Sequence, residues 1–231
     1  LAVWYRHFRH PSRRPSLGNA RLLRPILGIG LPEAGAVAVT TLGLLAMISL
    51  AGRIGGTEML AAFGISLRLL FLVMLPLEGF AIGVQPILAH AYGANDPARV
   101  ARALNRLVVL GLAVTGLLMV AFLLLPLPLA RLFTADPDVA QDTARNLRWL
   151  APALPAIALR LSAQILLQAT YRPRAAALLG LAPMGWLLLP VIALTIPTLG
   201  AAGLALSLTV STCLAALLAA FLMRRSLTHP V

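Results

Sequence analysis

The chain has 231 residues, of which 60% are hydrophobic and only 11% are charged, with a mean hydropathy of +0.90. These values exclude an ordinary soluble globular domain. The net charge is +12 at pH 7, but the 19 basic residues, all arginine, are distributed among separate segments rather than gathered on one face, which argues against nucleic acid as a partner.

Six long apolar stretches occupy most of the chain. Each is long enough for an α-helix to cross a hydrocarbon layer of about 30 Å, which takes about 20 residues. The expected fold class is therefore an all-α membrane protein with six transmembrane helices. We divide the chain into a basic cytoplasmic linker (1–25), a six-helix transmembrane lobe (26–223) and a cytoplasmic C-terminal tail (224–231). The predicted spans are Ile26–Gly52, Met59–Ala89, Leu104–Leu129, Leu150–Thr170, Ala175–Ile196 and Ala201–Met223.

The arginines predict the orientation of these spans. If the N-terminus is cytoplasmic, the inner segments hold thirteen arginines and the outer segments hold four, which is the bias of bacterial inner-membrane proteins. Both termini are therefore expected in the cytoplasm of a bacterium. Arg68 and Arg160 are the two arginines inside apolar stretches.

The first span contains Glu33, about 10 Å from its cytoplasmic end at Ile26, and Thr40 lies on the same helical face. A carboxylate at this depth is a candidate proton site. It can equally be satisfied by free backbone amides near a helix break.

The second span contains Glu78 past its middle, between Pro76 and Gly79. Proline leaves a carbonyl without its donor and glycine loosens the next turn, so we expect a kinked helix at this carboxylate. Gln85 follows seven residues later on the same face. A carboxylate within a span is a candidate for ion or substrate coupling, and an ion pair of purely structural value is the alternative.

The connecting segments repeat one capping pattern. Asp96 is followed by Pro97, and Asp136 by Pro137, which are a typical N-cap and first helical residue. We expect a short interfacial helix after the first pair, with three arginines on one face for anionic lipid headgroups. The alternative is a solvated loop without a specific lipid. These arginines are Arg99, Arg102 and Arg106.

The fourth span carries Arg160 at its centre. Gln164, Gln168 and Tyr171 follow it at i+4, i+8 and i+11, which predicts one polar stripe. The stripe can line a cleft or form hydrogen bonds to neighbouring helices within the lobe. Arg160 can also form an ion pair with Glu78.

The sequence contains no Walker loop, HExxH pair, GxSxG elbow or Cys/His cluster. Cys213 is the only cysteine, so no intrachain disulfide is possible. We therefore expect no enzymatic activity, no metal site and no cofactor.

Three segments together resemble the multidrug and toxic compound extrusion (MATE) family of secondary transporters. The first segment, 28–32, opens the first span. The second combines 60–68, 74–79, Gln85-Pro86 and the loop 92–99. The third joins Leu132-Phe133 and Asp136 to Gln168-Ala169 and Arg172.

The resemblance implies a MATE-type fold, of which this chain looks like the C-terminal six-helix lobe. It also implies efflux of amphipathic, cationic organic compounds by alternating access, in exchange for protons or sodium ions. The expected partners are membrane lipids, the small organic substrate, and a missing N-terminal lobe or a second copy of the chain. The acidic residue that some members carry in the first helix of this lobe matches Thr40 or Thr41 here, so the coupling ion stays open.

Two alternatives remain at this point. The chain can be part of a flippase for a lipid-linked saccharide, which predicts a larger and more cationic cavity. It can also be a non-transporting or truncated membrane subunit. The candidate ion- or substrate-coupling residues are Glu78, Arg160, Gln164, Gln168, Gln85, Glu33 and Thr40.

Overall fold

The computed structural model describes residues 20–200 and 202–228, and every regular element among them is a helix. The predicted all-α fold is confirmed. The helices are α2 (Ala20–Gly93), α3 (Pro97–Leu124), α4 (Pro126–Arg131), α5 (Pro137–Leu150), α6 (Ala153–Ala169), α7 (Pro173–Leu181), α8 (Leu188–Leu199) and α9 (Ala202–Thr228).

Helix α2 consists of two arms that fold back on each other. Its 74 residues would extend for about 111 Å as one straight helix, far more than a bilayer. The break lies at Gly55 and Gly56, and Gly56 adopts a φ of 67°, which glycine tolerates because it has no Cβ. The arms, 20–54 and 57–93, correspond to the first two predicted spans. Helix α2 begins at Ala20, within the segment predicted as a linker; residues 1–19 lie outside the described part of the chain.

Both predicted Asp-Pro caps are confirmed. The Asp96 carboxylate accepts a hydrogen bond from the Arg99 amide at 2.9 Å, and the Asp136 carboxylate accepts one from the Asp138 amide at 2.9 Å. The separate interfacial helix predicted after Asp96 is wrong, because α3 continues without interruption from Pro97 to Leu124. Nothing between Arg99 and Leu124 breaks the helix, since this stretch contains no proline.

The later spans are more broken than their hydropathy indicates. The mixed-charge segment before the fourth predicted span is itself helical and forms α5. Helices α5 and α6 are bent by 48° relative to each other. The fifth predicted span divides into α7 and α8, with turns over 182–187, where the Trp186 indole donates to the Leu178 carbonyl at 3.2 Å. Helix α9 extends past Met223 to Thr228. By length and composition, the described helices include three that can cross a membrane, or four if α5 and α6 count as one span.

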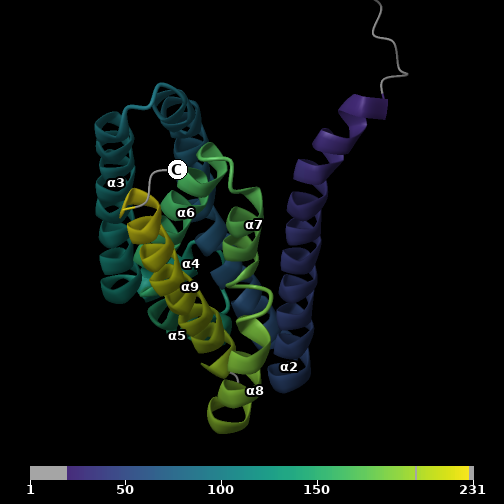
Figure 1. Ribbon diagram of the computed structural model, residues 1–231. Coiled ribbons are helices and arrows are strands. Elements are labelled where there is room, and N and C mark those ends of the chain that lie inside the picture. The colour runs from purple at the N-terminus through teal and green to yellow at the C-terminus, as the bar shows by residue number, and fades with distance from the viewer. Residues whose placement is uncertain (1–19, 201, 229–231) are drawn as a thin grey trace, which may run out of the picture.

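The core lies among α6, α9, α3, α5 and the second arm of α2, with α6 in contact with α9 and α3 (Figure 1). Hydroxyl groups within this bundle bond to helix carbonyls. Thr209 donates to the carbonyl of Trp149 at 2.6 Å, which joins α9 to α5, and Thr143 donates to that of Ala62 at 3.4 Å, which joins α5 to α2. Such bonds satisfy polar groups where lipid offers no partner.

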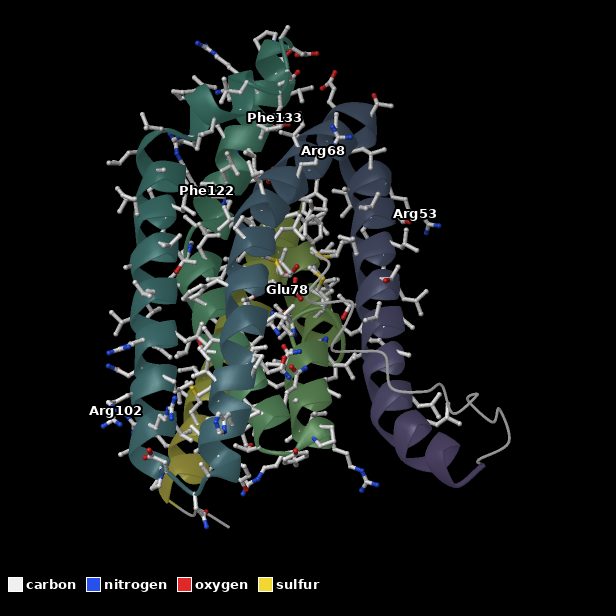
Figure 2. All side chains as sticks on the ribbon, turned by 90° about the horizontal axis from the view of Figure 1, so that it is seen from above. Arg53, Arg68, Glu78, Arg102, Phe122 and Phe133 are labelled. Atoms are coloured by element: carbon white, nitrogen blue, oxygen red, sulfur yellow. The ribbon has the colours of Figure 1, made fainter. Side chains whose placement is uncertain are left out.

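Different residues lie toward the two ends of the molecule. The start of α2 and the end of α9 lie at the same end (Figure 1). Figure 2 shows Arg102 toward one end, Arg53, Arg68 and Phe133 toward the other, and Glu78 between them. Arg68 is exposed, so this arginine of the second apolar stretch is not buried in the core.

Candidate functional site

A cavity of about 260 Å³, mostly apolar but with charged and polar side chains on its walls, lies between the two arms of α2, α6 and α7. We name it the Glu78 cavity. Its wall from the first arm contains Thr40, and its wall from the second arm contains Glu78. Helix α6 contributes Arg160 and Gln164. The lining is Ala36, Val37, Thr40, Thr41, Met74, Glu78, Ile157, Arg160, Leu161, Gln164 and Gly180.

A second cavity of about 420 Å³ adjoins the first and shares Glu78, Leu161 and Gln164 with it. We name it the Gln168 cavity. Gln85 comes from the second arm of α2, seven residues after Glu78, and Gln168 comes from α6, four residues after Gln164. The helical spacings predicted from the sequence therefore place both pairs on the cavity walls.

Arg160 is 8% exposed, and a buried guanidinium requires acceptors. It donates a hydrogen bond from Nη1 to the Gln164 Oε1 atom at 2.7 Å, within one turn of α6. Its Nε atom is buried and has no hydrogen-bond partner. Arg160 therefore has its guanidinium fixed at one side but incompletely satisfied.

Glu78 and Arg160 line the same cavity but do not form a direct ion pair among the described residues. Glu78 itself is exposed rather than enclosed by neighbouring helices. A carboxylate near the bilayer centre normally faces a cavity or a bundle interior, since lipid exposure costs about 2.5–3.5 kcal/mol on insertion scales.

Gly180 of α7 makes room for this arrangement. A Cβ atom at position 180 would lie 3.0 Å from the Gln164 Nε2 atom, closer than an ordinary contact. Sequence reasoning missed Gly180, because a glycine in an apolar stretch shows no sign of the side chain that will pack against it. Met74 and Pro173 also line the cavities and were missed, because nothing in the sequence distinguishes them from other residues of their segments.

Six of the seven predicted coupling candidates line these two cavities. The seventh, Glu33, belongs to α2, but its side chain lies outside the described ones. The predicted stripe on α6 ends at Gln168, because the helix ends at Ala169 and Tyr171 has left it with a φ of 57°. The three lipid-headgroup candidates, Arg99, Arg102 and Arg106, lie elsewhere, on the exposed face of α3.

Residues 32–194 match the MatE family, which is 163 of the 231 residues, and the chain belongs to this family of membrane transporters. It is not an enzyme. The protein described as "Probable multidrug resistance protein NorM" from Bradyrhizobium diazoefficiens is 33% identical over 123 residues, which cover 53% of this chain and 26% of that protein.

Solved MATE structures share the fold. A MATE transporter of Vibrio cholerae, VcmN, superposes with a TM-score of 0.86 at 18% identity, covering 98% of this chain and 51% of the other. A transporter of the MOP superfamily from Pyrococcus furiosus, described as having a binding pocket of reverse polarity, gives 0.81 at 18% identity and covers 97% and 50%. The chain therefore spans about half the length of these solved relatives.

Proposed function

We propose that this chain supplies one lobe of an antiporter that exports amphipathic, cationic organic compounds in exchange for protons or sodium ions. Family membership supports efflux as the general activity. The observation that carries the finer proposal is Glu78, a carboxylate on the wall of both cavities and midway between the ends of the molecule (Figure 2).

Antiport requires that the coupling ion and the substrate exclude each other. A single carboxylate in a cavity meets this requirement, because its negative charge can be neutralised by a proton, a sodium ion or a cationic substrate, but by only one at a time. Thr40 and Gln164 place further polar side chains on the other walls of the same cavity. Alternating access then moves the loaded site from one side of the membrane to the other.

A second lobe completes the transporter in this proposal. The chain spans about half of its solved relatives, and the first arm of α2 exposes apolar side chains beside the Glu78 cavity. Either a complementary lobe or a second copy of this chain fills the role. Two lobes that each have an even number of transmembrane helices can be related by an axis along the membrane normal, so a parallel homodimer is geometrically allowed.

The test is gradient-driven efflux of a fluorescent organic cation from proteoliposomes that contain the full chain, alone and with a complementary lobe. Glu78→Gln keeps the shape of the side chain and removes its charge, so efflux should fall to the leak rate in the assembled transporter. The matched control is Glu58→Gln, because Glu58 lines a separate pocket with Asp142 and Arg145. Full efflux by Glu78→Gln, or by a demonstrated monomer, contradicts the proposal.

Arg160 favours a second candidate function, the flipping of a lipid-linked saccharide. A guanidinium on the cavity wall can bind a phosphate or pyrophosphate headgroup. One cationic residue among acidic and neutral ones makes this the weaker candidate. Binding of a pyrophosphate-linked lipid that Arg160→Gln abolishes, without any efflux of organic cations, would favour it over the antiporter.

We also propose a bacterial inner-membrane location with both termini in the cytoplasm, on the arginine distribution. Single cysteines in a Cys213→Ala background test it. Ser12→Cys and Thr228→Cys should react only when the reagent reaches the cytoplasm, and Thr134→Cys should react from outside. External labelling at position 12 would reverse the orientation.

A further inference from the structure

An apolar groove of about 450 Å³ lies on the outer surface between the second arm of α2 and α3, and neither cavity of the proposed transport site includes its lining. The α2 wall follows the spacing 72, 76, 80, and the α3 wall follows the spacing 110, 114, 118. Its lining is Leu72, Val73, Pro76, Leu77, Phe80, Leu110, Gly111, Val114 and Leu118.

The floor of the groove is a close approach of helices. A Cβ atom at Gly111 would lie 3.3 Å from the Ala158 Cβ atom and 3.6 Å from the Leu77 Cδ1 atom, so α3 is near α6 and α2 here because residue 111 has no side chain. The rims remain open, since Leu110 is 51% exposed and Val114 is 53% exposed. The chain therefore leaves a concave apolar surface that its own side chains do not fill.

One ridge of α3 links this groove to two arginines. Residues four apart in a helix form a continuous row, and here the row contains two arginines followed by three groove residues. Each step advances about 6 Å along the axis, so the groove begins about 6 Å beyond the Cα atom of the second arginine and continues for about 12 Å. The row is Arg102, Arg106, Leu110, Val114 and Leu118.

Both arginines are free to bind a ligand. Arg102 and Arg106 are exposed, and Figure 2 shows Arg102 near the end of α3. Arg99 lies seven residues before Arg106 and adds positive charge on the same face. Positive charge therefore lies near the N-terminal end of α3, and the apolar groove begins about one turn further along the helix.

We propose that this row and groove bind one anionic phospholipid. The phosphodiester headgroup lies on Arg102 and Arg106, whose guanidinium groups match phosphate geometry. One acyl chain lies in the groove, over the close approach of the helices at Gly111. Charge complementarity is what distinguishes this site from the ordinary lipid-facing surface of the protein. The site is independent of Glu78, so it stands whether or not the chain proves to be an antiporter.

The test is native mass spectrometry of the full chain in detergent, titrated with phosphatidylglycerol and with phosphatidylcholine of the same acyl composition. One phosphatidylglycerol should bind on the order of tenfold more tightly than phosphatidylcholine, because two arginines contribute near the headgroup. Arg102→Gln with Arg106→Gln should remove that preference. Arg131→Gln with Arg148→Gln, two exposed arginines outside the row, is the charge-matched control and should retain it.

The groove has its own pair of variants. Val114→Phe places a ring between the walls and should weaken phosphatidylglycerol binding several-fold. Leu117→Phe on the same helix should not, because Leu117 is 71% exposed and does not line the groove. Equal binding of the two lipids, or normal binding by Val114→Phe, would overturn the proposal. A dimer that Val114→Phe dissociates would also overturn it, since the occupant would then be a second copy.

Discussion

The first arm of α2 and the helical bundle beside it differ in how far the chain itself buries their apolar side chains. In the bundle, side chains such as Leu154 and Leu166 on α6 are buried within the chain. Along residues 34–52 of the first arm, large apolar side chains such as Leu42 and Leu45 are exposed, and the arm lies along one side of the bundle (Figure 1). The bundle is therefore stabilised by its own packing, while the arm depends on lipid or on a partner. The Glu78 cavity lies between the two regions.

The arm meets the bundle through glycine. A Cβ atom at Gly43 would overlap the carbonyl oxygen of Met184, and one at Gly185 would lie 3.1 Å from the Val39 Cγ1 atom. Side chains of the arm also pack against the bundle, since Met47 is fully buried and Leu44 and Ile48 contact the core. At Gly43 the two backbones approach each other without a side chain between them, and this contact lies beside the cavity whose accessibility must change.

The largest contrast should come from a buried and an exposed leucine. Leu154→Ala removes a fully buried side chain from α6 and should destabilise the protein by about 2–5 kcal/mol. Leu42→Ala, at a position 64% exposed, should cost less than about 1 kcal/mol. Reversible unfolding in mixed micelles measures both. Equal losses would mean that the arm is as tightly packed as the bundle.

The boundary between the regions should respond to loss of the Gln164 amide. Gln164→Leu removes the acceptor of a buried guanidinium and should cost about 1.5–3 kcal/mol, since hydrogen bonds to charged groups are the stronger ones. Gln168 lines only the Gln168 cavity and has no such hydrogen bond among the described contacts. Gln168→Leu should therefore lower the free energy of unfolding by less than Gln164→Leu does. The same unfolding assay compares them. An effect of Gln168→Leu as large as that of Gln164→Leu would count against a specific role for the Arg160 bond.

In the first arm of α2, docking against the bundle should be sensitive to an alanine at one glycine position and tolerant of an alanine at another. Gly43→Ala should push the first arm from Met184 and destabilise its docking by about 1–3 kcal/mol. Gly35→Ala, with open space around it, should be neutral or stabilising by up to about 1 kcal/mol, because alanine is the better helix former. Hydrogen exchange of the first arm reports both variants. Unchanged protection in Gly43→Ala would show that the arm is not held at this contact.

The smallest change in stability should follow Gly180→Ala. The gain in helix propensity offsets the contact with the Gln164 amide, so unfolding should shift by no more than about 0.5 kcal/mol. Ligand affinity at the Glu78 cavity should nevertheless fall several-fold, because Gln164 must move. Gly116→Ala, which meets open space on α3, is the control. A fall in stability without a change in affinity would place Gly180 in packing alone.

The features that could be predicted from the sequence are those that depend on neighbouring residues in the chain. Apolar length identified the helical membrane class, and Asp96 and Asp136 were recognisable caps because a cap depends on neighbouring residues. Helical spacing also grouped Gln164 with Gln168 and Gln85 with Glu78. The sequence did not predict that α6 and the second arm of α2 present these pairs to the same cavities, because that depends on contacts between residues far apart in the chain.

The errors have two origins. The break between α7 and α8 lies at turns over 182–187, which contain Pro183 and Gly185, so a local helix-breaking signal was overlooked there. Arg160 lines the Glu78 cavity, which was one of its two expected positions, but its hydrogen-bond acceptor is Gln164 on its own helix rather than Glu78. Which of two polar neighbours satisfies a buried arginine is decided by geometry that spacing alone does not contain.

The two prolines that bound α3 determine how the protein can respond to membrane thickness. Pro97 begins the helix and Pro126 begins the next one, so α3 is confined to 28 residues, or about 42 Å. Its apolar part after Arg106, 107–124, is about 27 Å long and matches a hydrocarbon layer of about 30 Å, with the arginines at headgroup level. In a much thinner bilayer we expect α3 to tilt, and its close contact with α6 at Gly111 and Ala158 is where that tilt would be felt first.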